Sequence, residues 1–458
     1  MDLDRVIVEV PEYDRFLTVD EMDASTRRLA EQHPEVVSLR EVGRSRKGHP
    51  ILCLRVGEGR YRALLFGCPH PNEPIGAMML EYLSWRLAED RDLRDGMGYT
   101  WYLIKCIDPD GTRLNEGWFG GPFTLHNYAR HYYRPPLFQQ VEWTFPITYK
   151  KLNWRDPMPE TRALMRVMEE VRPHFIFSLH NAGFGGVYYY LSDPAPEIYP
   201  LLQGLARGQG LPLQLGEPEM PYAQKLAEAI YRMPSTRDTY EYLERYSERD
   251  PTEVITAGTS SVDYAKRLAD TFALVCELPY FYDPRIDDQS PGTMRRSDAV
   301  LRSVELAAKF FCRLREHYDQ VRDMVREDNP FRVSLEHQFQ QVPHWLEAMR
   351  RWALEAPELQ RTATVAEEFD NLLLTRFGHL LARGLYARML EMELEDRTDD
   401  GGLKLHFRQA LDELLREAET LEGELNYTVI PIKKLVTVQL ASALYVARYV
   451  AEWGARTA

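Results

Sequence analysis

Three separate apolar runs in this 458-residue chain each lead to side chains that can bind a metal or move a proton. Residues 62–67 precede His70 and Glu73, residues 175–179 end on His180, and residues 272–276 end on Glu277. Such short apolar runs are consistent with buried β-strands. Open α/β sheets bind ligands beyond the carboxyl ends of their strands, so these four side chains are expected to share one edge of one sheet.

The residue types of this group point to metal-assisted hydrolysis. Two His and one Glu are a common ligand trio for catalytic zinc, which keeps a fourth position open for water. We therefore predict that His70, Glu73 and His180 hold one Zn²⁺ per chain. The remaining carboxylate, Glu277, is then the expected general base.

The spacing His-x-x-Glu occurs twice, at His70–Glu73 and again at His344–Glu347. The second copy lies inside a long helical pattern and is typical of a helix surface. The first follows an apolar β-run and precedes Pro74, and proline is favoured at the first position of a helix. This context favours the first copy as the ligand pair.

These residues resemble the zinc metallocarboxypeptidases of the carboxypeptidase A type. Five landmarks follow the family's order between about residue 20 and residue 290. The first three are the His-x-x-Glu pair at His70, a loop at Asp108–Gly111 that resembles the family's Asn-Pro-Asp-Gly, and a strand ending on His180. The last two are a stretch at 257–264 that is similar to Ser-Gly-(small)-Asp-Trp and a later strand ending on Glu277. The resemblance implies a mixed, mostly parallel twisted sheet with helices on both faces, over residues 1–325.

The resemblance also implies a mechanism. Zinc on the three ligands would activate a water molecule, and Glu277 would take its proton and pass it to the leaving amine. The family stabilises the oxyanion with an arginine located after the Asp108–Gly111 loop. Arg113, Arg130 and Arg134 fit that interval, and the aromatic and proline setting of Arg134 favours it.

Substrate-binding residues are also inferred from the resemblance. The family's Asp-x-Asn-Arg element has its nearest counterpart at Lys151–Arg155, where Lys replaces the Asp and the Arg is displaced by one residue. This assigns Asn153 and Arg155 to the substrate's carboxylate. Asn181 follows the third ligand. Val262 occupies the position that forms the floor of the family's side-chain pocket, which predicts a neutral, apolar or aromatic residue at the carboxyl end of the substrate.

The predicted function is a zinc carboxypeptidase that releases a carboxyl-terminal residue from a peptide. One alternative is an N-acyl amino acid amidohydrolase of the aspartoacylase or desuccinylase kind, which would use the same four residues in a tighter pocket. A binding module without catalysis is disfavoured because the three ligands and Glu277 are all present.

Charge and hydropathy set the outer limits. A formal net charge of −14 argues against nucleic acid or an anionic membrane as the main partner. The amino terminus lacks the pattern of a signal peptide, and the most apolar long segment, 432–450, contains Lys433, Lys434 and Arg448, so we expect a buried amphipathic helix there. The five Cys are expected as free thiols in a cytoplasmic protein.

The elements around the site follow from periodicity and from helix start and stop signals. Helices are predicted at 19–32, 74–89 and 159–172, and strands at 36–42, 51–56, 62–67 and 101–107. The stretch 108–156 is long, aromatic and aperiodic, and we expect it to form a wall of the substrate cleft.

The carboxyl-terminal part has a different character from residue 326 onwards. Helical patterns run through 335–356, 364–393, 403–422 and 432–453, which predicts an all-helical bundle over 326–458. The resemblance does not cover this part. It could pack on the enzyme, cap the cleft or form a homo-oligomer interface.

Overall fold

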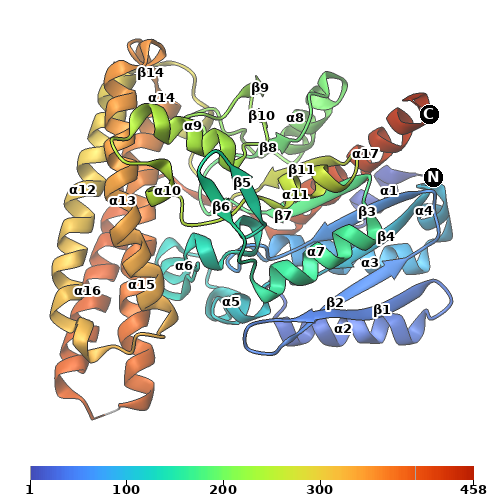
Figure 1. Cartoon of the computed structure of the whole chain (residues 1–458), viewed down its shortest axis with the longest axis horizontal. Helices are drawn as coiled ribbons and strands as arrows, with labels where there is room; N and C mark the ends of the chain where they lie inside the picture. The colour runs from blue at the N-terminus through green and yellow to red at the C-terminus, as the bar shows by residue number, and fades with distance from the viewer. Residues whose placement is uncertain (1, 398, 458) are drawn as a thin grey trace.

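A single mixed β-sheet forms the centre of the protein (Figure 1). The structure is a computed structural model and describes residues 2–397 and 399–457. In spatial order the strands are β1 (Val37–Arg44), β2 (Pro50–Val56), β4 (Tyr99–Ile104), β3 (Tyr61–Phe66), β7 (Phe175–His180), β11 (Phe272–Glu277), β8 (Tyr188–Leu191), β10 (Ile230–Arg232) and β9 (Lys225–Ala227). The central strands from β4 to β11 are parallel, as are β8 and β10, and the other neighbours are antiparallel.

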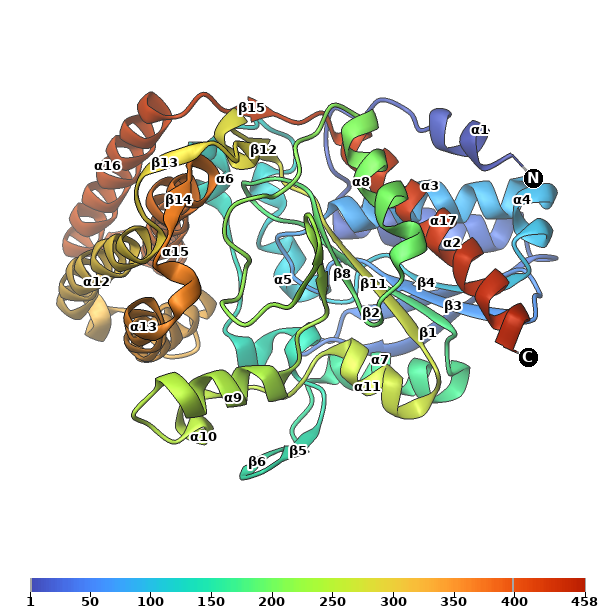
Figure 2. The ribbon, with the colours of Figure 1, turned by 90° about the horizontal axis from the view of Figure 1, so that it is seen from above.

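Helices cover both faces of this sheet, as Figure 2 shows. One face carries α1 (Leu3–Val8), α2 (Val19–Gln32), α3 (Ile75–Glu89), α8 (Tyr199–Gly208) and α17 (Ile432–Thr457). The opposite face carries α7 (Pro159–Val171) and α11 (Ser261–Leu268). The mixed α/β fold with helices on both faces confirms the fold class expected from the sequence.

The strand period of two distributes the side chains between two cores. Along β3, Ala63 and Leu65 pack beneath α3 and its neighbours, whereas Leu64 and Phe66 pack towards α7 and α11. Because both faces are buried, the strand is a continuous apolar run rather than an alternating one. This double burial explains why the three runs stood out in the sequence.

The remaining elements lie at the edges of the sheet or connect its layers. They are α4 (Arg91–Gly96), α5 (Pro109–Arg113), η1 (Glu116–Trp118), α6 (Leu125–His131), η2 (Leu137–Gln139), η3 (Val141–Trp143), β5 (Ile147–Tyr149), β6 (Leu152–Trp154), η4 (Pro196–Ile198), α9 (Thr236–Tyr246), α10 (Pro251–Val254), β12 (Phe281–Tyr282), η5 (Pro284–Asp287), β13 (Pro291–Arg295) and β15 (Thr428–Val429). Several of them subdivide the stretch 108–156, whose short turns have no period long enough to detect.

A layer of helices packs beside the sheet (Figure 1). It contains α12 (Arg296–Val321), η6 (Arg322–Met324), α13 (Pro330–Glu355), η7 (Pro357–Leu359), β14 (Thr362–Thr364), α14 (Val365–Phe369), the π-helical turn η8 (Asp370–Leu374), α15 (Thr375–Asp396) and α16 (Gly401–Glu424). Helix α15 contacts α12, α13 and α16 within the layer, and it contacts α6 outside it.

The helices are grouped differently from the sequence prediction. Helix α17, expected in the bundle, packs instead against α3 and the strands β7 and β11. Its residues from 435 to 447 are buried almost throughout, as a helix needs to be when it is apolar on most of its sides. The predicted boundary at residues 325 and 326 falls between α12 and α13, which pack against each other.

The structure also bears on the expectations drawn from hydropathy and from the five Cys. No helix in the described residues is long and apolar enough to cross a membrane. All five Cys are free thiols, and four of them are buried, with Cys312 exposed.

Candidate metal centre

The turn after β3 brings the first two ligands to the edge of the sheet. Gly67 lies so close to the backbone of Lys105 and Ala77 that a side chain would not fit. The next residue, Cys68, has a φ of 52°, a left-handed conformation that reverses the path of the chain. His70 and Glu73 follow in the loop that leads into α3.

The third ligand and the expected base come from two neighbouring strands. Glu277 at the end of β11 pairs in register with His180 at the end of β7. The two strands are parallel, so both side chains reach the same sheet edge as the loop of His70. The structure thus brings together all four residues that the sequence singled out.

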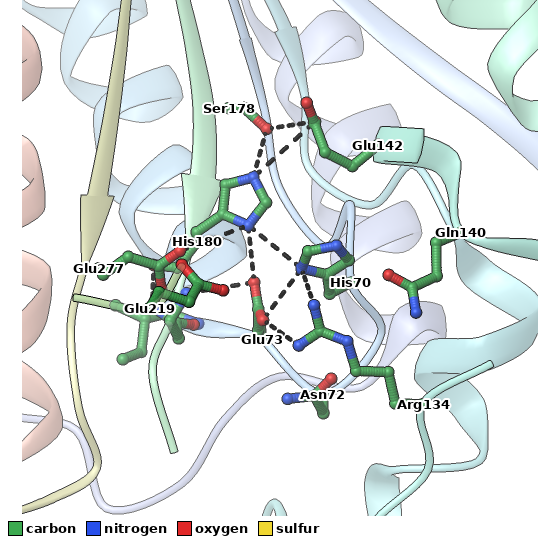
Figure 3. A network of polar contacts seen from close by, with 12 residues as sticks. His70, Asn72, Glu73, Arg134, Gln140, Glu142, Ser178, His180, Glu219 and Glu277 are labelled. Carbon is green, nitrogen blue, oxygen red and sulfur yellow. Dashed lines mark hydrogen bonds and ion pairs between the residues drawn. The ribbon is translucent and has the colours of Figure 1, made fainter. Parts of the chain in front are cut away.

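The donor atoms of the trio converge on one point (Figure 3). The Nδ1 atoms of His70 and His180 are 3.2 Å apart. Each lies 3.1 Å from a different carboxylate oxygen of Glu73. All three side chains are buried, and their ligand atoms lie within 4.8 Å of one another. Two imidazole nitrogens and a carboxylate in this arrangement fit a zinc ion.

The electrostatics of the trio favour a cation. Burial and the Arg134 guanidinium lower the pKa of His70 to about 4, which keeps its imidazole neutral and able to bind a metal. Burial works against a charged His180, but hydrogen bonds with Glu142 and Glu73 raise its pKa well above the usual value. The protein without metal therefore stabilises a positive charge between these carboxylates. A metal ion would take the place of that proton.

Glu277 lies beside the trio. Its Oε1 atom is 3.9 Å from Nδ1 of His180, and the side chain is only 11% exposed. Burial raises its pKa well above the usual value, and the carboxylates of Glu73 and Glu219 add to the effect. A raised pKa suits a carboxylate that must accept a proton and release it again.

A buried carboxylate that the sequence did not reveal lies behind His180. The period of two along β7 puts Ser178 on the same face as His180, and its hydroxyl is 2.8 Å from Nε2 of that ring. Ser178 donates to Glu142 at 2.9 Å, and Glu142 also accepts hydrogen bonds from the backbone and hydroxyl of Ser261. The far side of the ring is thus held by a carboxylate and a hydroxyl, as is common for metal-bound histidines.

Gln140 occupies a related position beside His70 (Figure 3). Its amide donates to the carbonyl of Pro135 at 2.7 Å, whereas its Oε1 has no hydrogen-bond partner. The Nε2 atom of His70 is likewise buried without a partner. A signal for Gln140 and Glu142 was present in the sequence, because polar residues alternate with apolar ones at 140–143 within an otherwise aromatic stretch.

Of the three candidate arginines, only Arg134 reaches the centre. Its guanidinium donates to Glu73 at 2.9 Å and lies 2.7 Å from Nδ1 of His70. Arg113 pairs instead with Asp20 at 2.6 Å, and Arg130 donates to Glu391 at 2.9 Å. The preference for Arg134 therefore agrees with the geometry.

His70, Glu73, Glu277 and Arg134 line one cavity of about 200 Å³ beside His180, which we call the metal cavity. Its other lining residues come from several elements, and two of them, Tyr128 and Tyr132, belong to the stretch 108–156 that was expected to form a wall of the cleft. The full set is Asn72, Tyr128, Tyr132, Asn181, Ala182, Gly183, Tyr188, Glu219, Phe377 and Leu381. The polar atoms of the Asn181 side chain are already engaged, since Oδ1 accepts from Ile75 N at 3.1 Å and Nδ2 donates to the carbonyl of His180 at 2.6 Å.

Three expected substrate-binding residues are not at the metal cavity. Asn153 and Arg155 belong to the β5–β6 hairpin, where Arg155 donates to Asn153 at 2.9 Å, and the hairpin projects away from the sheet (Figure 2). Val262 belongs to α11, is 3% exposed and packs in the core together with residues of α7. It lines neither the metal cavity nor a second cavity of about 470 Å³ that shares Glu219 with it. The displaced Arg and the missing Asp had already set this stretch apart from the family's Asp-x-Asn-Arg element.

The second His-x-x-Glu copy lies on α13, as its helical pattern indicated. Within residues 2–397 and 399–457, the one group of three close metal-binding side chains is His70, Glu73 and His180.

A family model described as zinc carboxypeptidase matches residues 22–283 of the chain. The comparison with curated proteins returned no match. Among solved structures, carboxypeptidase A from Helicoverpa armigera is 16% identical, with 61% of this chain and 69% of that chain covered and a TM-score of 0.38. A metallo-carboxypeptidase from Burkholderia cenocepacia is also 16% identical, with 57% of this chain and 60% of that chain covered and a TM-score of 0.35.

Proposed function

The chain belongs to the zinc carboxypeptidase family, and on that premise we propose that it is a zinc-dependent peptidase that releases a residue from the carboxyl end of peptides. One observation carries the proposal. The ligand atoms of His70, Glu73 and His180 converge beside a cavity that His70, Glu73, Glu277 and Arg134 line. A ligand trio, a carboxylate with a raised pKa and a guanidinium around one cavity are what amide hydrolysis requires.

The roles of the side chains follow from their positions. When bound by the trio, zinc would polarise the scissile carbonyl and lower the pKa of a water molecule. Glu277 accepts the proton of the attacking water and delivers it to the leaving amine. Arg134 supplies a positive charge where negative charge develops on the carbonyl oxygen. Glu142 and Ser178 keep the His180 ring in one orientation.

A peptide is favoured over a small N-acyl amino acid by the space around the metal cavity. A second cavity of about 470 Å³ shares Glu219 with it. A substrate bound at the trio can therefore extend past Glu219 with several further groups. An amidohydrolase for small molecules has no use for so much additional room.

The test combines metal analysis with product analysis. We expect one zinc per chain, loss of hydrolysis on chelation, and recovery when zinc is returned. His70→Ala and His180→Ala should abolish zinc binding, and His344→Ala serves as the matched control that keeps it. Full zinc occupancy in either ligand variant would refute the assignment of the trio.

Substrate class is decided by offering three sets of compounds to the zinc-loaded protein. These are short peptides with a free carboxyl end, the same peptides with an amidated end, and N-acyl amino acids. We expect single residues to be released from the first set. Hydrolysis confined to the N-acyl amino acids would instead establish the amidohydrolase.

A further inference from the structure

The second cavity lies between the helical layer and the segments that face it, and we call it the aromatic cavity. Its lining residues come from η2, η3, the loop 217–222, α9, the stretch 254–258, α12, α13, η8 and α15. Its large aromatic side chains are Trp143, Tyr222, Trp345 and Trp352. The last two belong to α13, so a helix outside the matched segment 22–283 forms part of the wall.

The charged side chains of the aromatic cavity are all acidic. They are Glu217, Glu219 and Asp370, and no Lys, Arg or His is among its lining residues. Glu217 is neutralised by Arg296, which donates to it at 2.9 Å. A negatively charged substrate group would meet the carboxylate of Glu219 here, and none of the residues that line the cavity is a cation that could bind it.

Asp370 is held at the wall by an unusual backbone turn. It begins the π-helical turn η8, a conformation that is rare and found mostly at functional sites. Its Oδ2 accepts from Gln214 at 2.7 Å and from the backbone of Glu217 at 2.6 Å. Its Oδ1 is buried and has no hydrogen-bond partner among the described residues, and Asp370 as a whole is only 9% exposed although it lines the cavity. A buried acceptor without a donor is costly, and the two hydrogen bonds to Oδ2 hold the side chain in place despite that cost.

Glu219 stands at the junction of the two cavities. It accepts hydrogen bonds from the hydroxyls of Tyr188 at 3.3 Å and Tyr190 at 3.1 Å. Across the part of the chain that the structure describes, no Lys, Arg or His lies within 4 Å of its carboxylate. Glu219 is exposed, and its charge acts at longer range on Arg134 of the metal cavity. A group passing from the trio into the aromatic cavity therefore meets a carboxylate that no ion pair at close range neutralises.

We propose that the aromatic cavity binds the side chain of a lysine or arginine residue next to the scissile bond, with Glu219 as the carboxylate that recognises its positive charge. This inference rests on the proposed function and specifies its substrate. It replaces the neutral preference derived from Val262, because that residue is in the core.

The chemistry of a basic side chain matches both parts of the cavity. Its aliphatic stem can pack on the Trp and Tyr side chains, and its charged end is attracted to aromatic faces and to a carboxylate. A hydrogen bond between charged partners is stronger than one between neutral groups.

The experiment compares peptides that differ only in lysine against norleucine, which has the same stem without the charge. Both are placed in turn at the released position and at the position before it. For one of the two positions, we expect kcat/KM of the zinc-loaded protein to favour lysine by about tenfold or more, the range of a charged hydrogen bond. Glu219→Gln should remove most of that preference, and Glu219→Lys should reverse it towards a glutamate-containing peptide.

A matched control is Glu253→Gln. Glu253 is exposed on α10, next to Val254 of the cavity wall, but it lines neither cavity. This substitution also removes one negative charge close to the cavity. The ratio of kcat/KM for the lysine peptide to kcat/KM for the norleucine peptide should stay at the wild-type value. A ratio that is equally unaffected by Glu219→Gln would overturn the inference.

A binding measurement separates this inference from the proposed function. In a Glu277→Gln background, the dissociation constants of the intact peptides can be measured by calorimetry without turnover. Lysine-selective binding that disappears with Glu219→Gln supports the inference, even if the parent protein cleaves none of the peptides. Equal binding of lysine and norleucine peptides refutes it, even if the parent protein cleaves both.

Discussion

His180 carries the greatest number of interactions in the proposed metal centre, because both of its ring nitrogens are engaged. Nδ1 faces Glu73 and His70, and Nε2 faces Ser178 with Glu142 behind it. Its backbone carbonyl is also fixed, since it accepts from Gln439 of α17 at 3.2 Å. The ring is therefore oriented before any metal arrives, which reduces the cost of binding one.

The carboxylate behind His180 should matter for metal affinity. We expect Glu142→Gln to weaken zinc binding by about 10–100-fold, the usual effect of losing a partner of a metal-bound histidine. Zinc affinity can be measured by competition with a chelating dye. Glu160→Gln is the matched control, because Glu160 is also fully buried but its neighbour is Arg46. Equal zinc affinities in the two variants would show that Glu142 does not support the ligand.

Glu277 is expected to act on the reaction and not on the metal. Glu277→Gln should keep one zinc per chain and lose about 10²–10⁴-fold in kcat, since a proton-transfer group contributes that much. Metal content and turnover are measured on the same preparation. A variant that stays within a few-fold of the parent would mean that another group is the base.

Helix α15 joins the helical layer to the walls of the metal cavity. It packs against α6, which supplies Tyr128 to that cavity, while α15 itself supplies Phe377 and Leu381. The contact is close at Gly384, where a Cβ atom would collide with the backbone carbonyl of Ala129. The absence of a side chain at this one position allows the two helices to approach.

This contact predicts opposite effects for two glycines of the same helix. Gly384→Ala should lower the free energy of unfolding by about 1–3 kcal/mol, because the new methyl group overpacks the interface. Gly378→Ala should be neutral or stabilising by up to about 1 kcal/mol, because Gly378 has no neighbour within 4 Å and alanine favours helix. Urea unfolding of both variants measures the difference. A neutral Gly384→Ala would mean that α15 and α6 are not in close contact.

The two ends of the chain meet on one face of the sheet. Helix α17 packs against α1, α3 and α8, and the hydroxyl of Tyr99 in β4 donates to the carbonyl of Ala447 at 2.8 Å. The segment 22–283 therefore does not bury its own sheet completely. It needs a helix that lies about 150 residues further along the chain.

This packing predicts that residues 1–325 will not fold alone. A fragment ending there lacks α17 and leaves apolar side chains of α3, β7 and β11 in water. Circular dichroism during heating should show no cooperative transition for the fragment, in contrast to the full chain. A cooperative transition would establish residues 1–325 as an independent domain.

The sequence alone determined the parts of this protein that depend on local order along the chain. Apolar runs buried on two faces revealed the central strands, and the polar residues after them revealed His70, Glu73, His180 and Glu277. The structure brings these four side chains together because parallel strands deliver their carboxyl ends to one edge, whatever the rest of the fold does. Arg134, favoured for its rigid setting, is the one of the three candidate arginines that reaches the trio.

Only the tertiary structure decided which distant side chains join that edge. Glu142 lies in the short turn η3 and Glu219 lies in a loop, and their local sequence does not say where the chain carries them. Val262 has the spacing of a pocket residue but turns into the core. The last helix has the pattern of a bundle helix and covers the sheet instead. The hydrophobic period of a helix or strand identifies the face that is buried, but it does not identify the element that packs against that face. Many elements present apolar faces of similar pattern, and only contacts between distant parts of the chain decide which of them pair.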